Sequence, residues 1–222
     1  MADWASYRLE DFLLFAPRAY WRLFELHNAA LWPVQPLILL LGLGVAVLVL
    51  RGSPWAGRVG FALLAAGWAA VALLFFWQRY ASINWAAPYV MPVFLAEAVL
   101  LSLLGFSGGS GVSPPGVWRF REWAGAGLFF YALALHPLQP LLAGRPLAQA
   151  EIVGLAPDPT AIATLGLLCL IPRGLVAVLA MAIPVAWCLV SAATLQAMGE
   201  SQYLVPLAAA GFACIASFLP PR

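Results

Sequence analysis

Long apolar runs separated by short polar stretches make up most of this chain. The runs cover residues 31–50, 57–77, 88–106, 123–142, 174–193 and 203–219. Each is about 20 residues long, the length that a helix needs to cross the hydrocarbon core of a bilayer. They predict six transmembrane helices.

A shorter apolar stretch, residues 151–172, lies between the fourth and fifth of these runs. It has room for a helix of about 13 residues from Pro159 onward, which covers roughly 20 Å of a core of roughly 30 Å. Gly154 and Pro157 make residues 152–158 unsuited to a helix. We therefore expect residues 152–158 to enter the membrane as extended backbone beside a cavity. If the stretch spans, the chain has seven spans; if it re-enters, it has six.

The N-terminal region has a different pattern. Apolar side chains from Leu9 to Phe24 recur at helical spacing, and charged side chains fall largely on the other face. The pattern predicts an amphipathic helix from about Leu9 to Leu26, bent near Pro17, that lies on the membrane surface. The expected fold is thus all-α, with an interfacial helix in residues 1–28 and a transmembrane bundle in residues 29–222.

Composition fixes the class of protein. Of the 222 residues, 64% are hydrophobic and 9% are charged, far less charge than soluble domains carry. The lipid bilayer is the expected partner, with other membrane subunits or a second copy as further candidates. The net charge of +2 is too small and scattered to indicate nucleic-acid binding.

Arginine placement predicts an orientation. If the first span runs from outside to inside, six arginines fall on the inner side and two in the outer loops between spans; the inner ones are Arg51, Arg58, Arg119, Arg121, Arg173 and Arg222, and the outer ones are Arg79 and Arg145. Basic residues favour the cytoplasmic side. The N-terminus is therefore expected outside and the C-terminus in the cytoplasm.

Four short strings resemble an uncharacterised family of bacterial multi-span membrane proteins. They are NAALWPVQ at 28–35, SINWAA at 82–87, YALALHPL at 131–138 and VGLAPDPT at 153–160. The family usually has Pro-Cys-Pro-Thr where this chain has Pro-Asp-Pro-Thr, and Tyr in place of His136, so thiol chemistry does not transfer. The resemblance implies a helical membrane fold in the bacterial inner membrane and no particular activity.

Glu97 is a candidate functional residue because it lies in the middle of the third apolar run. An ionised carboxylate there costs roughly 3 kcal/mol or more, so the side chain should be protonated, paired or facing water. Two interpretations stay open: a proton or cation site, or a neutral acid bonded to a neighbouring helix.

His136 and Gln139 belong to a His-Pro-Leu-Gln-Pro sequence in the fourth run. Pro137 and Pro140 release backbone carbonyls from the helix, and these can satisfy the imidazole or share a ligand with it. Haem bound by His136 and His27 is a further alternative, less favoured than a histidine satisfied by a carbonyl, and no cofactor is implied.

Asp158 and Thr160 flank Pro159 at the predicted start of the short helix, where an N-cap is expected. Because this helix start lies at membrane depth, a cation or proton site is the alternative. Asn28, Trp32 and Gln35 share one face if a single helix contains them. They either face the bundle or anchor it at the interface. Asn28, Gln35, His136 and Gln139 would form the wall of an outward-facing polar pocket that Glu97 closes from below.

No catalytic or metal-binding motif occurs, so no catalytic residue and no metal ligand is assigned. Three functions remain open. The first is a small transporter or channel-like protein for an ion, proton or small solute. The second is a structural or assembly subunit of a larger membrane complex, and the third a cofactor-binding membrane protein or enzyme.

Overall fold

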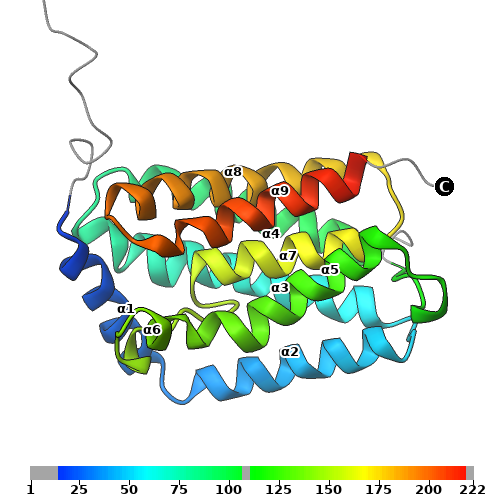
Figure 1. The fold of residues 1–222 in the computed structure, drawn as a ribbon, viewed down its shortest axis with the longest axis horizontal. Coiled ribbons are helices and arrows are strands. Elements are labelled where there is room, and N and C mark those ends of the chain that lie inside the picture. The colour runs from blue at the N-terminus through cyan, green and yellow to red at the C-terminus, as the bar shows by residue number, and fades with distance from the viewer. Residues whose placement is uncertain (1–14, 107–110, 219–222) are drawn as a thin grey trace, which may run out of the picture.

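The computed structural model describes residues 15–106 and 111–218, which form helices and connecting loops with no strand among them (Figure 1). The α-helices are α1 (Pro17–Leu31), α2 (Val34–Leu50), α3 (Ala56–Ala70), α4 (Ala87–Phe106), α5 (Phe120–Phe130), α6 (Gln139–Leu142), α7 (Pro157–Leu170), α8 (Leu175–Ala197) and α9 (Leu204–Phe218). Short 3-10 or π segments are Val71–Trp77, Tyr80–Ser82, Pro115–Val117, Tyr131–Leu135, His136–Leu138, Leu147–Gln149 and Ser201–Tyr203.

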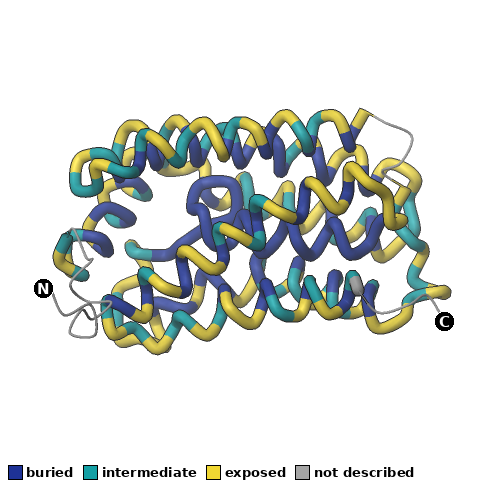
Figure 2. The backbone as a smooth tube through the Cα atoms, turned by 90° about the horizontal axis from the view of Figure 1, so that it is seen from above, coloured by how far each residue is buried: buried dark blue, intermediate teal, exposed yellow. Residues whose placement is uncertain are grey.

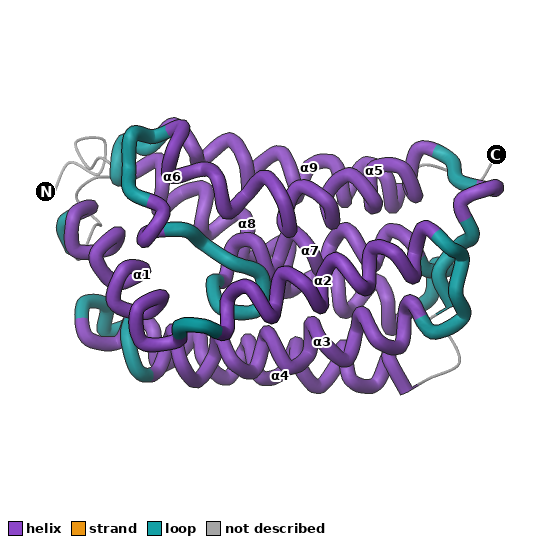
Figure 3. The backbone as a smooth tube through the Cα atoms, turned by 90° about the horizontal axis from the view of Figure 1, so that it is seen from below, coloured by secondary structure: helices purple, strands orange, loops and turns teal. Residues whose placement is uncertain are grey.

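The helices α2, α3, α4, α5, α7, α8 and α9 run along the long axis of the molecule, and α1 lies across one end (Figure 1). α1 and α2 meet at an angle of 87°. Most loops gather at the two ends of this bundle (Figure 3). This is the arrangement expected of helices whose apolar side chains face lipid and whose connections face water.

Four helical stretches are long and apolar enough to cross a membrane: Ala56–Ser82, Ala87–Phe106, Phe120–Leu142 and Leu175–Ala197. The bent pair α1 and α2 passes the same test when it is taken as one span. Taken singly, α2, α7 and α9 have 17, 14 and 15 residues and are too short for it. By length and composition, the structure therefore has four or five spans.

The short helix α7 occupies the centre of the bundle (Figure 2). Every residue from Ala150 to Ile171 is buried, and α7 packs against α3, α5, α8 and α9. Gly125 of α5 and Gly166 of α7 allow a very close approach, since a Cβ added to Gly125 would lie 2.6 Å from the Gly166 carbonyl oxygen. Small residues at such crossings let two helix backbones pack directly.

Two predicted elements differ from the structure. The N-terminal helix begins at Pro17 and continues to Leu31; Phe15 and Ala16 are not helical, and residues 9–14 of the predicted helix lie outside the described residues. Pro17 therefore occupies the first helical position, where its missing N–H costs nothing, and does not bend a longer helix. The apolar run at residues 174–193 forms the helix α8, which continues four residues beyond the predicted end, to Ala197.

Candidate functional site

The loop that leads into α7 enters the bundle (Figure 3). It makes a turn in which the N–H groups of Leu155 and Ala156 both donate to the Ile152 carbonyl, at 3.0 and 2.9 Å. Gly154 has a φ of +79°, and a Cβ on Gly67 of α3 would lie only 2.8 Å from the Gly154 Cα. A non-helical loop is thus present at the predicted place, but it forms a turn instead of extended backbone.

Thr160 fixes this turn to the first turn of α7. Its hydroxyl accepts from the Gly154 N–H at 2.7 Å and donates to the Ala156 carbonyl at 2.6 Å. Thr164 continues the chain of contacts, donating to the Thr160 carbonyl and accepting from the indole of Trp68. Buried polar groups must be paired in this way, so Thr160 has a structural role here.

Asp158 does not cap α7, which corrects the prediction made from its place before Pro159. The helix starts two residues earlier, at Pro157, and the N-cap position belongs to Ala156. The Asp158 carboxylate instead accepts from the Trp187 indole at 2.8 Å and from the Ser191 hydroxyl, both on α8. It lies in the first turn of α7, where a negative charge is favourable for the helix dipole.

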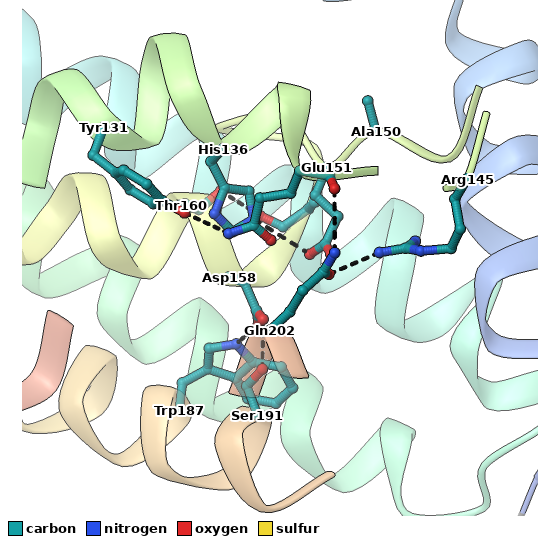
Figure 4. A network of polar contacts seen from close by, with 12 residues as sticks. Tyr131, His136, Arg145, Ala150, Glu151, Asp158, Thr160, Trp187, Ser191 and Gln202 are labelled. Carbon is teal, nitrogen blue, oxygen red and sulfur yellow. Dashed lines mark hydrogen bonds and ion pairs between the residues drawn. The ribbon is translucent and has the colours of Figure 1, made fainter. Parts of the chain in front are cut away.

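His136 and Glu151 face one another beside this helix start (Figure 4). The imidazole Nε2 lies 3.9 Å from the Glu151 Oε2, and the two residues are 2% and 5% exposed. The Tyr131 ring packs edge-on against the imidazole, with 5.9 Å between centroids. A separation of 3.9 Å is too long for a direct hydrogen bond, so neither of these two atoms satisfies the other.

Arg145 lies near His136 and Glu151, and its guanidinium has two partners on different sides (Figure 4). Its guanidinium donates to Gln202 at 2.7 Å and lies 3.3 Å from the centroid of the Trp21 ring. Gln202 in turn donates to the Gln139 carbonyl at 3.2 Å, and the Gln139 amide donates to the Tyr131 hydroxyl. Burial lowers the pKa of Arg145, while the nearby carboxylates of Glu151 and Glu200 act in the opposite direction.

Several buried polar atoms in this group have no hydrogen-bond partner among the described residues. They are Nδ1 and Nε2 of His136, Oε2 of Glu151, and Nε and Nη1 of Arg145. Donors and acceptors left unpaired inside a protein are costly unless water or a ligand meets them. We name His136, Glu151 and Arg145 the polar cluster.

Asn28 and Gln35 lie beside the polar cluster, and their amide nitrogens are already bonded, while the Gln35 Oε1 has no hydrogen-bond partner among the described residues. The Asn28 amide donates to the Ala148 and Ala150 carbonyls, both at 2.8 Å, and Gln35 donates to the Asn28 carbonyl at 2.7 Å. The predicted single face of Asn28, Trp32 and Gln35 is wrong, because the chain turns between α1 and α2 at Trp32, whose side chain is 71% exposed. These amides position the loop that precedes α7.

Glu97 lies apart from the polar cluster, in the middle of α4. It is fully buried, and both carboxylate oxygens lack a hydrogen-bond partner among the described residues. It therefore does not close the predicted pocket through any bond to His136 or Gln139. Since a buried carboxyl without a partner is most stable when neutral, Glu97 is a second candidate for holding a proton.

The described residues contain no group of three His, Cys, Asp or Glu side chains placed to hold a metal ion. His27, the partner that a bis-histidine haem would need, has its Nε2 3.1 Å from the Leu155 carbonyl. That bond fixes α1 to the turn before α7, which is a structural use of this histidine. The described residues therefore fit neither a metal ion nor a haem held by His27 and His136 well.

Sequence reasoning did not single out Glu151 or Arg145, the two charged members of the polar cluster. Glu151 opens the apolar stretch that forms the buried loop, and a charge at such a position is the signal that could have found it. Arg145 gives no such signal. It lies in a loop of mixed composition, and only the fold places it over Trp21.

A comparison with protein families decides where the chain belongs. Residues 17–221, from the start of α1 to beyond α9, match a family of unknown function, DUF6064. The chain belongs to this family. No curated protein and no solved structure matches the DUF6064 chain. The comparison thus agrees with the expected resemblance to an uncharacterised family and assigns no activity.

Proposed function

We propose that this protein is an integral membrane protein with seven spans, and that α1 lies on the membrane surface. The helices α2 to α5 and α7 to α9 run side by side along the long axis (Figure 1). Many large apolar side chains of these helices are exposed. α7 is too short to span alone, at about 21 Å, and the buried loop before it supplies the missing depth.

The proposed orientation puts the α1 end outside and the opposite end in the cytoplasm, in a bacterial inner membrane. The turn between α2 and α3 and the start of α5 hold Arg51, Arg58, Arg119 and Arg121. The positive-inside rule assigns that end to the cytoplasmic face. The polar cluster then lies toward the outer side.

For the activity, we propose a small transporter or channel-like protein in which the polar cluster takes up a proton. The observation that carries this proposal is the group of five unpartnered polar atoms on His136, Glu151 and Arg145. Two carboxyl groups, Glu151 and Asp158, against one guanidinium favour a cation over an anion. The described residues hold no group of three His, Cys, Asp or Glu side chains for a metal ion, so a proton is the cation that we propose. The imidazole and the carboxyl group beside it are both able to bind and release a proton.

Proton flux into liposomes tests this proposal. The purified full-length chain is reconstituted with a pH-sensitive dye inside, and a potassium diffusion potential drives proton entry. We expect faster acidification than in empty liposomes, and a rate close to that of empty liposomes for Glu151→Gln and His136→Gln. Both variants should keep a melting temperature close to that of the wild type in detergent, because neither imidazole nitrogen of His136 nor the Glu151 Oε2 has a hydrogen bond among the described residues to lose.

Glu25→Gln is the matched control, since Glu25 lies on α1 outside the polar cluster and bonds to Arg22. A wild-type rate equal to that of empty liposomes would contradict proton transport. In that case, stable co-purification with other membrane proteins after mild solubilisation would favour the structural-subunit function. Wild-type rates in both cluster variants would remove the polar cluster from the path.

A further inference from the structure

A long groove lies between α3 and α4 on the surface of the bundle, with a volume of about 1000 Å³. Small side chains form much of its walls; among them are Ala62, Ala66, Ala69, Ala98 and Gly105. At one end, next to the turn between α2 and α3, the walls are Trp55 and Arg58. The groove is therefore apolar along its length and cationic at one end.

Arg58 is placed where its side chain can bind the headgroup of a lipid. Its guanidinium is stacked on the exposed Trp55 ring, with 5.5 Å between Cζ and the ring centroid. Among the described residues no carboxylate pairs with it, so its charge is available. Tryptophan and arginine together are typical of the depth of lipid headgroups.

A second groove, of about 360 Å³, lies on the other side of α3, where α2, α3, α5 and the loop before α7 meet. Its walls are apolar side chains and glycines, and Ala66 belongs to both grooves. The surface of α3 between the two grooves is shallow, because Ala62 and Ala66, which are exposed there, have small side chains. Two apolar grooves thus flank α3. The first includes Arg58 itself, and the second begins at Gly60, two residues further along the same helix.

We propose that this face binds one anionic diacyl phospholipid, with its phosphate on Arg58 and one acyl chain in each groove. The proposal rests on the membrane insertion and orientation given above, and it does not depend on the polar cluster. In that orientation Arg58 faces the cytoplasmic leaflet, where anionic lipids and basic side chains attract one another. An apolar helix from a second copy would fill one groove and leave the Arg58 charge without a partner.

Lipid titration followed by native mass spectrometry tests the proposal on the full-length chain in detergent. The probes are phosphatidylglycerol and phosphatidylcholine with identical acyl chains. We expect one phosphatidylglycerol to bind per chain, more tightly than phosphatidylcholine. Arg58→Gln should weaken phosphatidylglycerol binding about fivefold and leave phosphatidylcholine binding unchanged, the effect expected of one basic side chain near an anionic headgroup.

Three further variants separate the groove from the general charge of this end. Arg51→Gln removes an exposed arginine of the same turn that does not line the groove, and it should bind both lipids as the wild type does. Ala66→Phe fills the wall shared by both grooves and should weaken both lipids. Ala208→Phe, which fills the unrelated groove between α5 and α9, should weaken neither.

Equal losses in Arg51→Gln and Arg58→Gln would overturn the proposal in favour of diffuse surface charge. Equal binding of the two lipids by the wild type would also overturn it. A dimer in the native spectrum that disappears in Ala66→Phe, without any lipid preference, would identify a second copy as the occupant. Failure of proton flux with a retained lipid preference would leave the lipid site standing and contradict the proposed function alone.

Discussion

The two ends of α7 are both buried, but the polar groups around them differ in how many have hydrogen-bond partners. At the C-terminal end, Arg121 of α5 donates to the carbonyls of Ile171 and Leu168, at 2.6 and 2.9 Å, and the Ser113 N–H donates to Leu170 at 2.9 Å. The carbonyls of these three residues thus have hydrogen-bond donors. One guanidinium nitrogen of Arg121, Nε, has no hydrogen-bond partner among the described residues. At the N-terminal end, five atoms of the polar cluster remain without partners.

The comparison separates polar groups that the backbone of α7 requires from polar groups that it does not require. The last carbonyls of a buried helix need donors, and one arginine at the negative end of the helix dipole satisfies that need. The N-terminal end needs only acceptors for a few N–H groups, yet the fold brings a histidine, a glutamate and a second arginine to it. Groups beyond what the backbone requires are the ones that indicate a ligand.

Removing the arginine at the C-terminal end should have the largest effect on stability. Arg121→Met leaves two buried carbonyls without donors, and we expect a loss of about 4 kcal/mol in the free energy of unfolding. Unfolding by sodium dodecyl sulfate in mixed micelles, followed by tryptophan fluorescence, measures it. Arg51→Met, at an exposed arginine, should stay near the wild type. A small loss in Arg121→Met would show that water already reaches this end.

Closing the narrow crossing of α5 and α7 should have the next largest effect. In Gly125→Ala the new methyl group would lie 2.6 Å from the Gly166 carbonyl oxygen, so the helices must separate, at a cost of about 3 kcal/mol. Gly127→Ala on the same helix meets open space and should be neutral or slightly stabilising. The same unfolding assay compares them. Equal stability of the two variants would contradict the close packing.

At the N-terminal end, Asp158→Ala should cost about 2 kcal/mol, because the Trp187 indole and the Ser191 hydroxyl lose their acceptor. Asp158→Asn retains one acceptor oxygen and should lose less. Tryptophan fluorescence should also shift in Asp158→Ala, since Trp187 changes its bonding. A loss typical of a simple cap, with unchanged fluorescence, would contradict the contact to α8.

Acidification should weaken the N-terminal end by a smaller amount, through His27. Burial lowers the pKa of His27 to about 4 from an ordinary value of 6.5. As the pH falls below 6.5 the unfolded chain takes up a proton that the folded chain refuses, so stability should fall between pH 6.5 and 4. The loss at pH 5.5 should be about 1 kcal/mol. In His27→Gln this part of the pH dependence should disappear; an unchanged slope would assign it to other groups.

The sequence was sufficient for the helical class and for the place of α7. Apolar runs of about 20 residues and the Gly and Pro residues before Pro159 act locally, so their effects are visible in the sequence. The role of Arg121 was not visible. It falls in an arginine-rich segment that predicts only a cytoplasmic face, yet its partners lie 47 and 50 residues further along the chain. Contacts of that range depend on how the helices pack.

The same reason explains the error at Asp158. An aspartate before a proline at a helix start satisfies every local rule for an N-cap, and the side chain nevertheless bonds to α8. The partner residues lie 29 and 33 positions away. Local rules predict which hydrogen bonds a side chain can make within its own helix. Whether it makes them depends on the partners that neighbouring helices offer.

The central position of α7 also sets an order for assembly during synthesis. Its walls include α8 and α9, which follow it in the chain, so its final surroundings do not exist when α7 itself leaves the ribosome. Until residue 218 has been made, the buried loop and the charges of Glu151 and Asp158 have no complete enclosure. An incomplete bundle must hold this segment, and the last two helices close the protein around it.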